Sequence, residues 1–140
     1  MSALPFDPVV IVGEFAYVSG QIATDAENEL VARGIVGADV DTDTAIRCAE
    51  ACGRNVLAQL ERIPGGLDRV ERLVKLTVFV AAAPGFDRPH VVANGASGVL
   101  LAALGDRGKH ARSAIGVASL PLGSPVEVEA IVQLVRASDA

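Results

Sequence analysis

A stripe of apolar residues at helical spacing within residues 42–63 constrains the fold of this chain more than any other feature. Its members recur at steps of three and four residues: Ile46, Ala49, Cys52, Val56, Leu60 and Ile63. The residues Asp41, Thr42 and Asp43 are candidate caps for its start. The run Pro64-Gly65-Gly66 then stops a helix. The sequence therefore predicts one long amphipathic helix that must bury its apolar face against another layer.

Runs of β-branched and aromatic residues predict the strands of that layer. The predicted strands are residues 9–12, 15–19, 72–83, 111–117 and 126–135. The third of these runs is apolar enough to be a central strand covered on both faces. A second helix is predicted from residue 90 to about residue 104. Two glycines in its middle, Gly95 and Gly98, each cost about 1 kcal/mol relative to Ala, which predicts a close approach of this helix to the sheet or to another subunit.

These elements predict a single α+β domain spanning residues 1–140. Residues 24–39 are polar and punctuated by Gly34 and Gly37, so we expect a loop with one short strand. The architecture is then a mixed sheet of about six strands with two helices on one face. The other face of the sheet needs a cover, and so short a chain has little left to provide one. Association with copies of itself is the simplest solution, which predicts an oligomer.

Charge and composition argue against several classes of function. Twelve Lys and Arg against seventeen Asp and Glu give a formal charge of −5, which disfavours nucleic-acid binding. A local basic patch made of Arg107, Lys109, His110 and Arg112 is the alternative to a solvated loop at that place. The sequence has no basic N-terminal region before an apolar stretch and no apolar run of about 20 residues that would span a membrane. We therefore expect a cytoplasmic protein with no membrane partner.

Cys48 and Cys52 lie four residues apart within the first predicted helix, so they share one helix face. Small apolar core residues are the simplest interpretation of this pair. A disulfide or a metal site is the more specific interpretation, but the sequence offers no further Cys and no suitable His as additional metal ligands. The sequence also contains no glycine-rich phosphate loop and no nucleophile elbow.

Arg112 is the first candidate for chemistry, because the segment around it, residues 111–117, is too apolar for a wholly exposed strand. Its guanidinium is suited to gripping a planar carboxylate through two parallel hydrogen bonds. An ion pair at the edge of the sheet is the alternative, and the residues alone favour it. Ser19-Gly20-Gln21, at the end of a predicted strand, is another candidate, with a simple turn as the alternative.

Glu127 and Glu129 fall on one face of the last predicted strand, because side chains alternate along a strand. Such a pair either marks solvent exposure or places one carboxylate in a cleft, where it positions or deprotonates a water. If the last two strands pair as a hairpin, Arg112 lies opposite about Val132 and roughly 10 Å from Glu129. A small substrate can bridge that gap.

Several short motifs, taken in order, resemble the YjgF/Rid family. They are Val18-Ser19-Gly20-Gln21-Ile22, Val74-Lys75-Leu76-Thr77-Val78-Phe79-Val80, Ala111-Arg112-Ser113, Leu120-Pro121 and Val126-Glu127-Val128-Glu129-Ala130-Ile131. Each motif is short, but their order and spacing within 140 residues make a strong signature. The resemblance implies a chorismate-mutase-like fold and a homotrimer with active sites in clefts between subunits.

The resemblance also implies an activity, the hydrolytic deamination of reactive 2-imino and 2-enamino acids such as 2-aminoacrylate to 2-oxo acids and ammonia. The family pattern implies neither a metal nor an organic cofactor. By that pattern Arg112 binds the substrate carboxylate together with the backbone N–H of Ala114, and Glu129 positions the attacking water. The remaining substrate-binding places fall on Ser19, Gly20, Asn94 and Phe6.

The chain departs from the family pattern at several of these places, which is typical of a divergent subgroup. Phe6 stands where well-characterised members carry Tyr, Ala114 stands where they carry Cys, and His110 replaces a usual Pro or Ala. Residues 85–98 differ as well. A non-catalytic trimer in which Arg112 binds a small carboxylate ligand is the main rival function. Ribonuclease activity is disfavoured by the acidic charge, and chorismate mutase activity has only fold analogy behind it.

Overall fold

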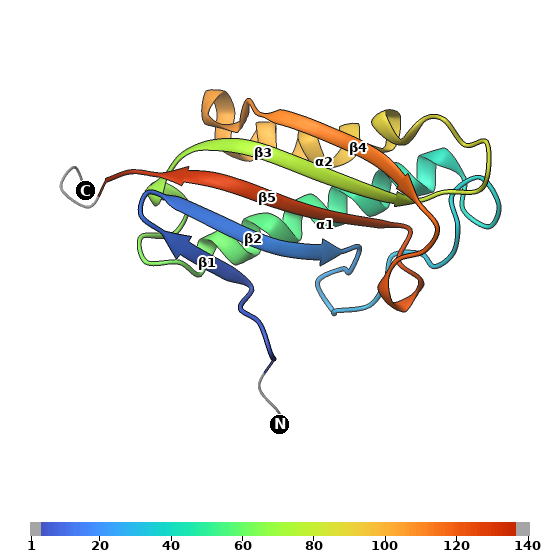
Figure 1. Ribbon diagram of the computed structural model, residues 1–140, viewed down its shortest axis with the longest axis horizontal. Coiled ribbons are helices and arrows are strands. Elements are labelled where there is room, and N and C mark those ends of the chain that lie inside the picture. Colours follow the sequence, from blue (N-terminus) through green and yellow to red (C-terminus); the bar gives the residue numbers. More distant parts are fainter. Residues whose placement is uncertain (1–3, 137–140) are drawn as a thin grey trace.

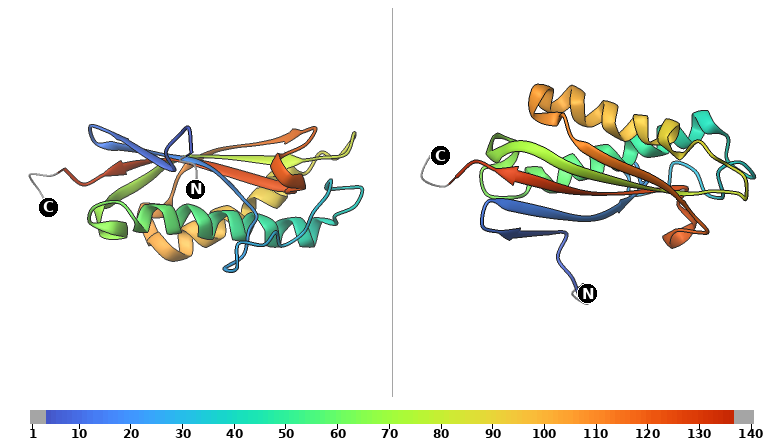
Figure 2. Two further views of the ribbon diagram at one scale, coloured as in Figure 1. Left: turned by 90° about the horizontal axis from the view of Figure 1, so that it is seen from below. Right: turned by 45° about the horizontal axis from the view of Figure 1, so that its top comes forward.

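Five strands form one mixed sheet, and two helices cover one of its faces (Figures 1 and 2). The structure is a computed structural model that describes residues 4–136. The strands are β1 (Val9–Val12), β2 (Phe15–Ile22), β3 (Val70–Ala81), β4 (Ala111–Val117) and β5 (Val126–Leu134). The helices are α1 (Thr42–Glu61) and α2 (Pro89–Leu104), with 3-10 turns η1 (Gly66–Arg69), η2 (Gly105–Gly108) and η3 (Pro121–Gly123). Within the described residues, neither helix is long and apolar enough to cross a membrane.

Helix α1 confirms the prediction from the apolar stripe. Asp41 caps its start, where its Oδ1 accepts a hydrogen bond from the Thr44 N–H at 2.8 Å. This hydrogen bond holds the pKa of Asp41 below its ordinary value. The helix ends at Glu61, and Gly65 and Gly66 follow in the left-handed region, with φ of 86° and 57°.

Cys48 and Cys52 are fully buried and take part in the hydrophobic core, as predicted. Both are free thiols, and the Cys52 Sγ donates to the carbonyl oxygen of Val126 at 3.4 Å. Burial raises the pKa of Cys48 to about 11 and raises the pKa of Cys52 as well. The two thiols are therefore protonated packing groups at neutral pH.

Helix α2 packs closely against α1, which corrects the prediction that its glycines approach the sheet or another subunit. A Cβ atom added at Gly95 would collide with the carbonyl oxygen of Ile46 and lie 3.2 Å from the Cβ of Ala49. Gly98, by contrast, has open space around it. The close contact is thus between the two helices, and only one of the two glycines is required for it.

The strand order β1-β2-β5-β3-β4 excludes the hairpin between the last two strands, on which the expected separation of Arg112 and Glu129 depended. Strand β3 lies between β4 and β5, parallel to the first and antiparallel to the second. As the longest strand, β3 is buried best with a neighbour on each side. Residues 24–39 form only isolated bridges and no strand, so the described sheet has five strands rather than about six.

Alternation along the strands divides the sheet into two faces. Val126, Val128 and Val132 of β5 are buried toward the helices. No segment within residues 4–136 covers the opposite face (Figure 2, left). It carries large apolar side chains that are between 39% and 61% exposed: Val10, Val12, Phe15, Tyr17 and Ile115. These side chains fit the predicted self-association.

Candidate functional site

Arg112 lies on the edge strand β4 and points toward the first half of α2. Its Nη1 donates to the Oδ1 of Asn94 at 2.9 Å and to the Oγ of Ser97 at 3.1 Å. Its Nη2 donates to the carbonyl oxygen of His90 at 3.2 Å. The guanidinium is thereby held in one orientation by three groups of one helix. The structure brings together two residues of the implied site, Arg112 and Asn94.

All three of these acceptors are uncharged. Among residues 4–136, the ion pairs join Lys109 to Asp106 at 3.4 Å and Arg136 to Glu14, and neither includes Arg112. The structural ion pair that the residues alone favoured is thus not formed in the described part of the chain. The Nε–H and one Nη2–H of Arg112 remain available for an anion.

The backbone of β4 offers a further donor next to Arg112. Val117 accepts a hydrogen bond from the Ala82 N–H, so its backbone groups point toward β3. Successive residues of a strand direct their backbone groups to opposite sides, which points the N–H of Ala114 to the outer edge of the sheet. Since β4 is the edge strand, this N–H lies on the same edge as the guanidinium.

Ser97 is a residue of this site that the sequence reasoning missed. Its Oγ lies 2.9 Å from the Nε2 of His110, and the Nδ1 of His110 lies 2.6 Å from the carbonyl oxygen of Gly108. Ser97 and His110 line a shallow cavity of about 310 Å³ beside Arg112. The sequence feature that could have indicated Ser97 is its spacing from Asn94, because residues three apart lie on the same face of a helix.

The four residues of the possible basic patch are mostly engaged in contacts within the chain. Arg107 donates to the carbonyl oxygens of Leu67 at 3.1 Å and Val70 at 2.7 Å, which fastens η2 to the start of β3. Arg112 is held by α2, and Lys109 pairs with Asp106. These side chains contact different neighbours and do not form one common cationic surface.

Glu129 lies on the uncovered face of the sheet, where it shares a cavity of about 280 Å³ with Ser19 and Tyr17. The Ser19 Oγ donates to the carbonyl oxygen of Asp7 at 2.7 Å, which fastens the N-terminal segment to β2. Phe6 precedes this contact and is 57% exposed. The structure thus brings together Ser19 and Glu129, two more residues of the implied site.

Glu127 is the more buried of the two carboxylates on this face. Burial and the neighbouring Glu129 raise its pKa. A Cβ atom added at Gly20 would collide with the Oε2 of Glu127, so Gly20 makes room for this carboxylate. The sequence placed the two carboxylates on the same face correctly, but it did not show that only Glu127 is half-buried.

Arg112 and Glu129 are not neighbours within one chain. Arg112 pairs with Leu76 of β3, which is buried under the helices, and Glu129 pairs with Thr77 on the uncovered face. Two strand spacings, roughly 10 Å, separate their backbones, and their side chains point to opposite faces. The expectation that one small substrate bridges them within a single chain is therefore wrong, because it depended on the hairpin.

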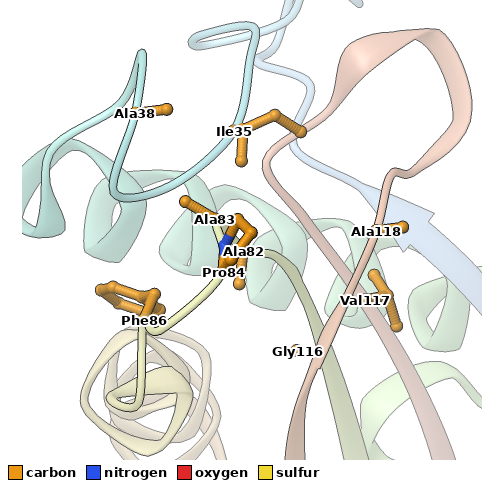
Figure 3. Close-up of a pocket in the computed structure, with 9 residues that line it drawn as sticks. All are labelled: Ile35, Ala38, Ala82, Ala83, Pro84, Phe86, Gly116, Val117 and Ala118. Carbon is orange, nitrogen blue, oxygen red and sulfur yellow. The ribbon is translucent and has the colours of Figure 1, made fainter.

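A cavity of about 560 Å³ is apolar and separate from these groups (Figure 3). The loop after β2, the end of β3 and the end of β4 contribute its walls: Ile35, Ala38, Ala82, Ala83, Pro84, Phe86, Gly116, Val117 and Ala118. None of these side chains is titratable. Within residues 4–136, no three His, Cys, Asp or Glu side chains are grouped so as to hold a metal ion.

Comparison with known proteins extends the likeness to almost the whole chain. The sequence model of the family described as endoribonuclease L-PSP matches residues 1–134. Protein TCP17 of Trypanosoma cruzi is 42% identical over 126 residues, which cover 89% of this chain and 78% of that protein. The crystal structure of Atu1372 from Agrobacterium tumefaciens, a protein described as of unknown function, is 41% identical with a TM-score of 0.89, over 96% of this chain and 85% of that one. RidA from the Antarctic bacterium Psychrobacter sp. is 28% identical with a TM-score of 0.59, over 95% and 97% of the two chains.

Proposed function

Because the chain belongs to the endoribonuclease L-PSP family, which is also called YjgF/Rid, we propose that it hydrolyses small 2-imino and 2-enamino acids to 2-oxo acids and ammonia. The observation that carries this proposal is the guanidinium of Arg112, which three uncharged acceptors hold in place without a described acidic partner. An oriented cation of this kind at a sheet edge favours a ligand with a carboxylate group.

The substrate carboxylate binds at the edge of β4 in this proposal. The Nε–H and the remaining Nη2–H of Arg112 form one side of the grip, and the Ala114 N–H forms the other. These donors are fixed before the substrate arrives, so binding costs little reorganisation. Asn94 contributes by holding Nη1 at 2.9 Å.

Glu129 activates the water in a composite site that requires a second copy of the chain. Arg112 and Glu129 point to opposite faces of one sheet, so a site that contains both draws them from two subunits. The exposed apolar side chains beside Glu129, among them Tyr17 and Val10, provide the surface for this association. We propose the homotrimer that the family resemblance implies.

The chemistry needs orientation and one proton carrier. A protonated imine is already electrophilic at its carbon. The water oxygen bonds to that carbon as the Glu129 carboxylate accepts one of the water protons. Glu129 then returns this proton to the nitrogen. As the C–N bond breaks and the C=O bond forms, Glu129 accepts the proton of the new hydroxyl group and passes it to the departing ammonia, so the products are an ammonium ion and the 2-oxo acid.

A ligand-binding role without catalysis is the second candidate, because a single chain presents the carboxylate grip without the water-activating group. Under that function Glu129→Gln leaves carboxylate binding unchanged and there is no hydrolysis for it to remove. The net charge of −5 disfavours the ribonuclease activity in the family's description.

The proposal is tested by the release of ammonia and 2-oxo acid from enzymatically generated 2-aminoacrylate and 2-iminobutyrate. Wild type is compared with Arg112→Ala and Glu129→Gln at equal protein concentration. We expect acceleration by wild type and its loss in both variants. A folded, oligomeric wild type that gives no acceleration contradicts the proposal and favours the ligand-binding role.

A further inference from the structure

We propose that His110 and Ser97 form a hydrogen-bonded relay that positions Arg112, so that His110 is a positioning residue of the carboxylate grip. This inference rests on the proposed function, since Arg112 is the group that binds the substrate there. It assigns a role to His110, which departs from the family pattern, and to Ser97.

The hydrogen-bond partners determine the direction of each bond in the relay. The Gly108 carbonyl oxygen can only accept, so the Nδ1 of His110, at 2.6 Å, carries the proton. In the neutral ring Nε2 is then an acceptor, and the Ser97 hydroxyl donates to it over 2.9 Å. With its proton committed to His110, the Ser97 Oγ presents its lone pairs to the Arg112 Nη1 at 3.1 Å.

Because Ser97 is buried, the orientation of its hydroxyl group decides whether it can accept a hydrogen bond from Arg112. Ser97 is only 9% exposed, so water does not readily replace a lost partner. A serine inside a helix can otherwise donate to the carbonyl oxygen four residues earlier, which here belongs to Ala93. Without His110 that rotation turns a lone pair of Ser97 away from Nη1. Arg112 then depends on the exposed Asn94 side chain and on one carbonyl.

The fold holds the Gly108 carbonyl, where the relay begins, in a fixed position. Gly108 lies under the end of α2, where an added Cβ would come 2.8 Å from the carbonyl oxygen of Leu100. The preceding residue, Arg107, fastens the same turn to β3 through the carbonyl oxygens of Leu67 and Val70. The Gly108 carbonyl is therefore fixed between α2 and the sheet, and it fixes the imidazole ring in turn.

Ser97 is not placed to act as a nucleophile itself. Its oxygen is occupied by both His110 and Arg112, and the residue is only 9% exposed. A relay and a nucleophile give different results with a serine-directed organophosphonate. The relay predicts no labelling of Ser97, and stoichiometric labelling overturns it.

The test compares His110→Ala, His110→Gln and Ser97→Ala with Leu101→Ala as the matched control. Leu101 lines the same cavity, is 40% exposed and makes no polar side-chain contact. The measurements are kcat and KM for 2-iminobutyrate, and the Kd of 2-oxobutyrate by titration calorimetry. The second measurement reports the carboxylate grip without requiring hydrolysis.

We expect His110→Ala and Ser97→Ala to raise KM and Kd by about two- to tenfold, the scale of one lost hydrogen bond, with kcat nearly unchanged. The double variant adds little to either single variant, because both break one relay. His110→Gln restores most of the affinity, because its amide oxygen can take the place of Nε2. Leu101→Ala changes neither constant.

Other results separate the two proposals. An unchanged Kd in His110→Ala overturns the relay, as does a fall in kcat at constant KM or an additive double variant. If wild type binds 2-oxobutyrate but hydrolyses no imine, the proposed function fails. The Kd values of the variants then still show whether His110 and Ser97 position Arg112. If wild type does not bind 2-oxobutyrate, both proposals are overturned.

Discussion

Arg112 and Glu129 lie on opposite faces of the same sheet, with strand β3 between their own strands. The guanidinium is held against α2, and the carboxylate lies beside Ser19 on the face without helices. Each half of the implied site is well formed, but one chain does not bring the two halves together. This relationship makes association of the chain a requirement of the proposed chemistry.

Arg112→Lys tests whether the grip depends on the shape of the guanidinium. A lysine ammonium cannot hold Asn94 and Ser97 and still present two parallel N–H groups to a carboxylate. We expect KM for 2-iminobutyrate to rise by about tenfold or more, the scale of a lost charge-assisted hydrogen bond. Arg47→Lys, on the exposed face of α1, is the control. An unchanged KM means that the positive charge alone is sufficient.

Glu129→Gln and Glu127→Gln form a matched pair on one face of β5. Removing the group that accepts the water proton should lower kcat by about a hundredfold or more. We expect this loss in Glu129→Gln and a much smaller one in Glu127→Gln, because Glu127 is packed against Gly20. Steady-state kinetics at pH 7.5 measures both. The reverse order of effects would assign the water to Glu127.

Glu127 should also make stability depend on pH. Burial, followed by the charge of Glu129, raises the pKa of this carboxyl in the folded state. Between the ordinary pKa and the raised one the folded state binds more protons than the unfolded state, so stability falls as pH rises through this window. Glu127→Gln removes this loss. We expect its unfolding midpoint to exceed that of wild type at pH 7, and the difference to vanish below about pH 4.

The exposed Glu71 supplies the control for this pH series. Glu71→Gln makes the same change of charge without relieving a buried carboxylate. Thermal unfolding of the three proteins from pH 3.5 to pH 8 gives the comparison. A stabilisation by Glu127→Gln that does not change with pH contradicts a titration origin.

Gly95→Ala and Gly98→Ala test the contact between the two helices. The methyl group at Gly95 would meet the backbone of Ile46, so we expect a loss of about 1–3 kcal/mol in the free energy of unfolding. At Gly98 there is open space, and alanine should stabilise the helix by up to about 1 kcal/mol. Urea unfolding measures both. Equal effects at the two positions contradict the packing of α2 on α1.

The sequence was most informative where one element carries its own pattern. The stripe from Ile46 to Leu60 gave α1 and its buried face, because helical periodicity is local. Alternation likewise placed Glu127 and Glu129 on one face of β5. The order of the strands was not determined in this way, because the segment between β4 and β5 is compatible both with a hairpin and with the observed arrangement, in which β3 lies between them.

In the candidate site, too, single residues could be predicted from the sequence, but contacts that depend on how the elements pack could not. The family resemblance pointed to Arg112, Asn94 and Glu129, and the structure joins the first two. The pattern within one strand does not show that Arg112 and Glu129 lie on opposite faces of the sheet, because that relationship depends on how β4 pairs. Ser97 was missed for a similar reason, since its contact with His110 exists only once α2 lies against β4.

A mixture of Arg112→Ala and Glu129→Gln subunits tests the composite site most directly. The two inactive variants are unfolded together, refolded as mixed oligomers and assayed for ammonia release from 2-iminobutyrate. A site built from two chains regains an intact Arg112 and an intact Glu129 at about one quarter of the interfaces of a random mixture. We predict a corresponding recovery of activity, absent when either variant is refolded alone. Mixed oligomers that remain inactive, while wild type refolded in the same way is active, would contradict the account.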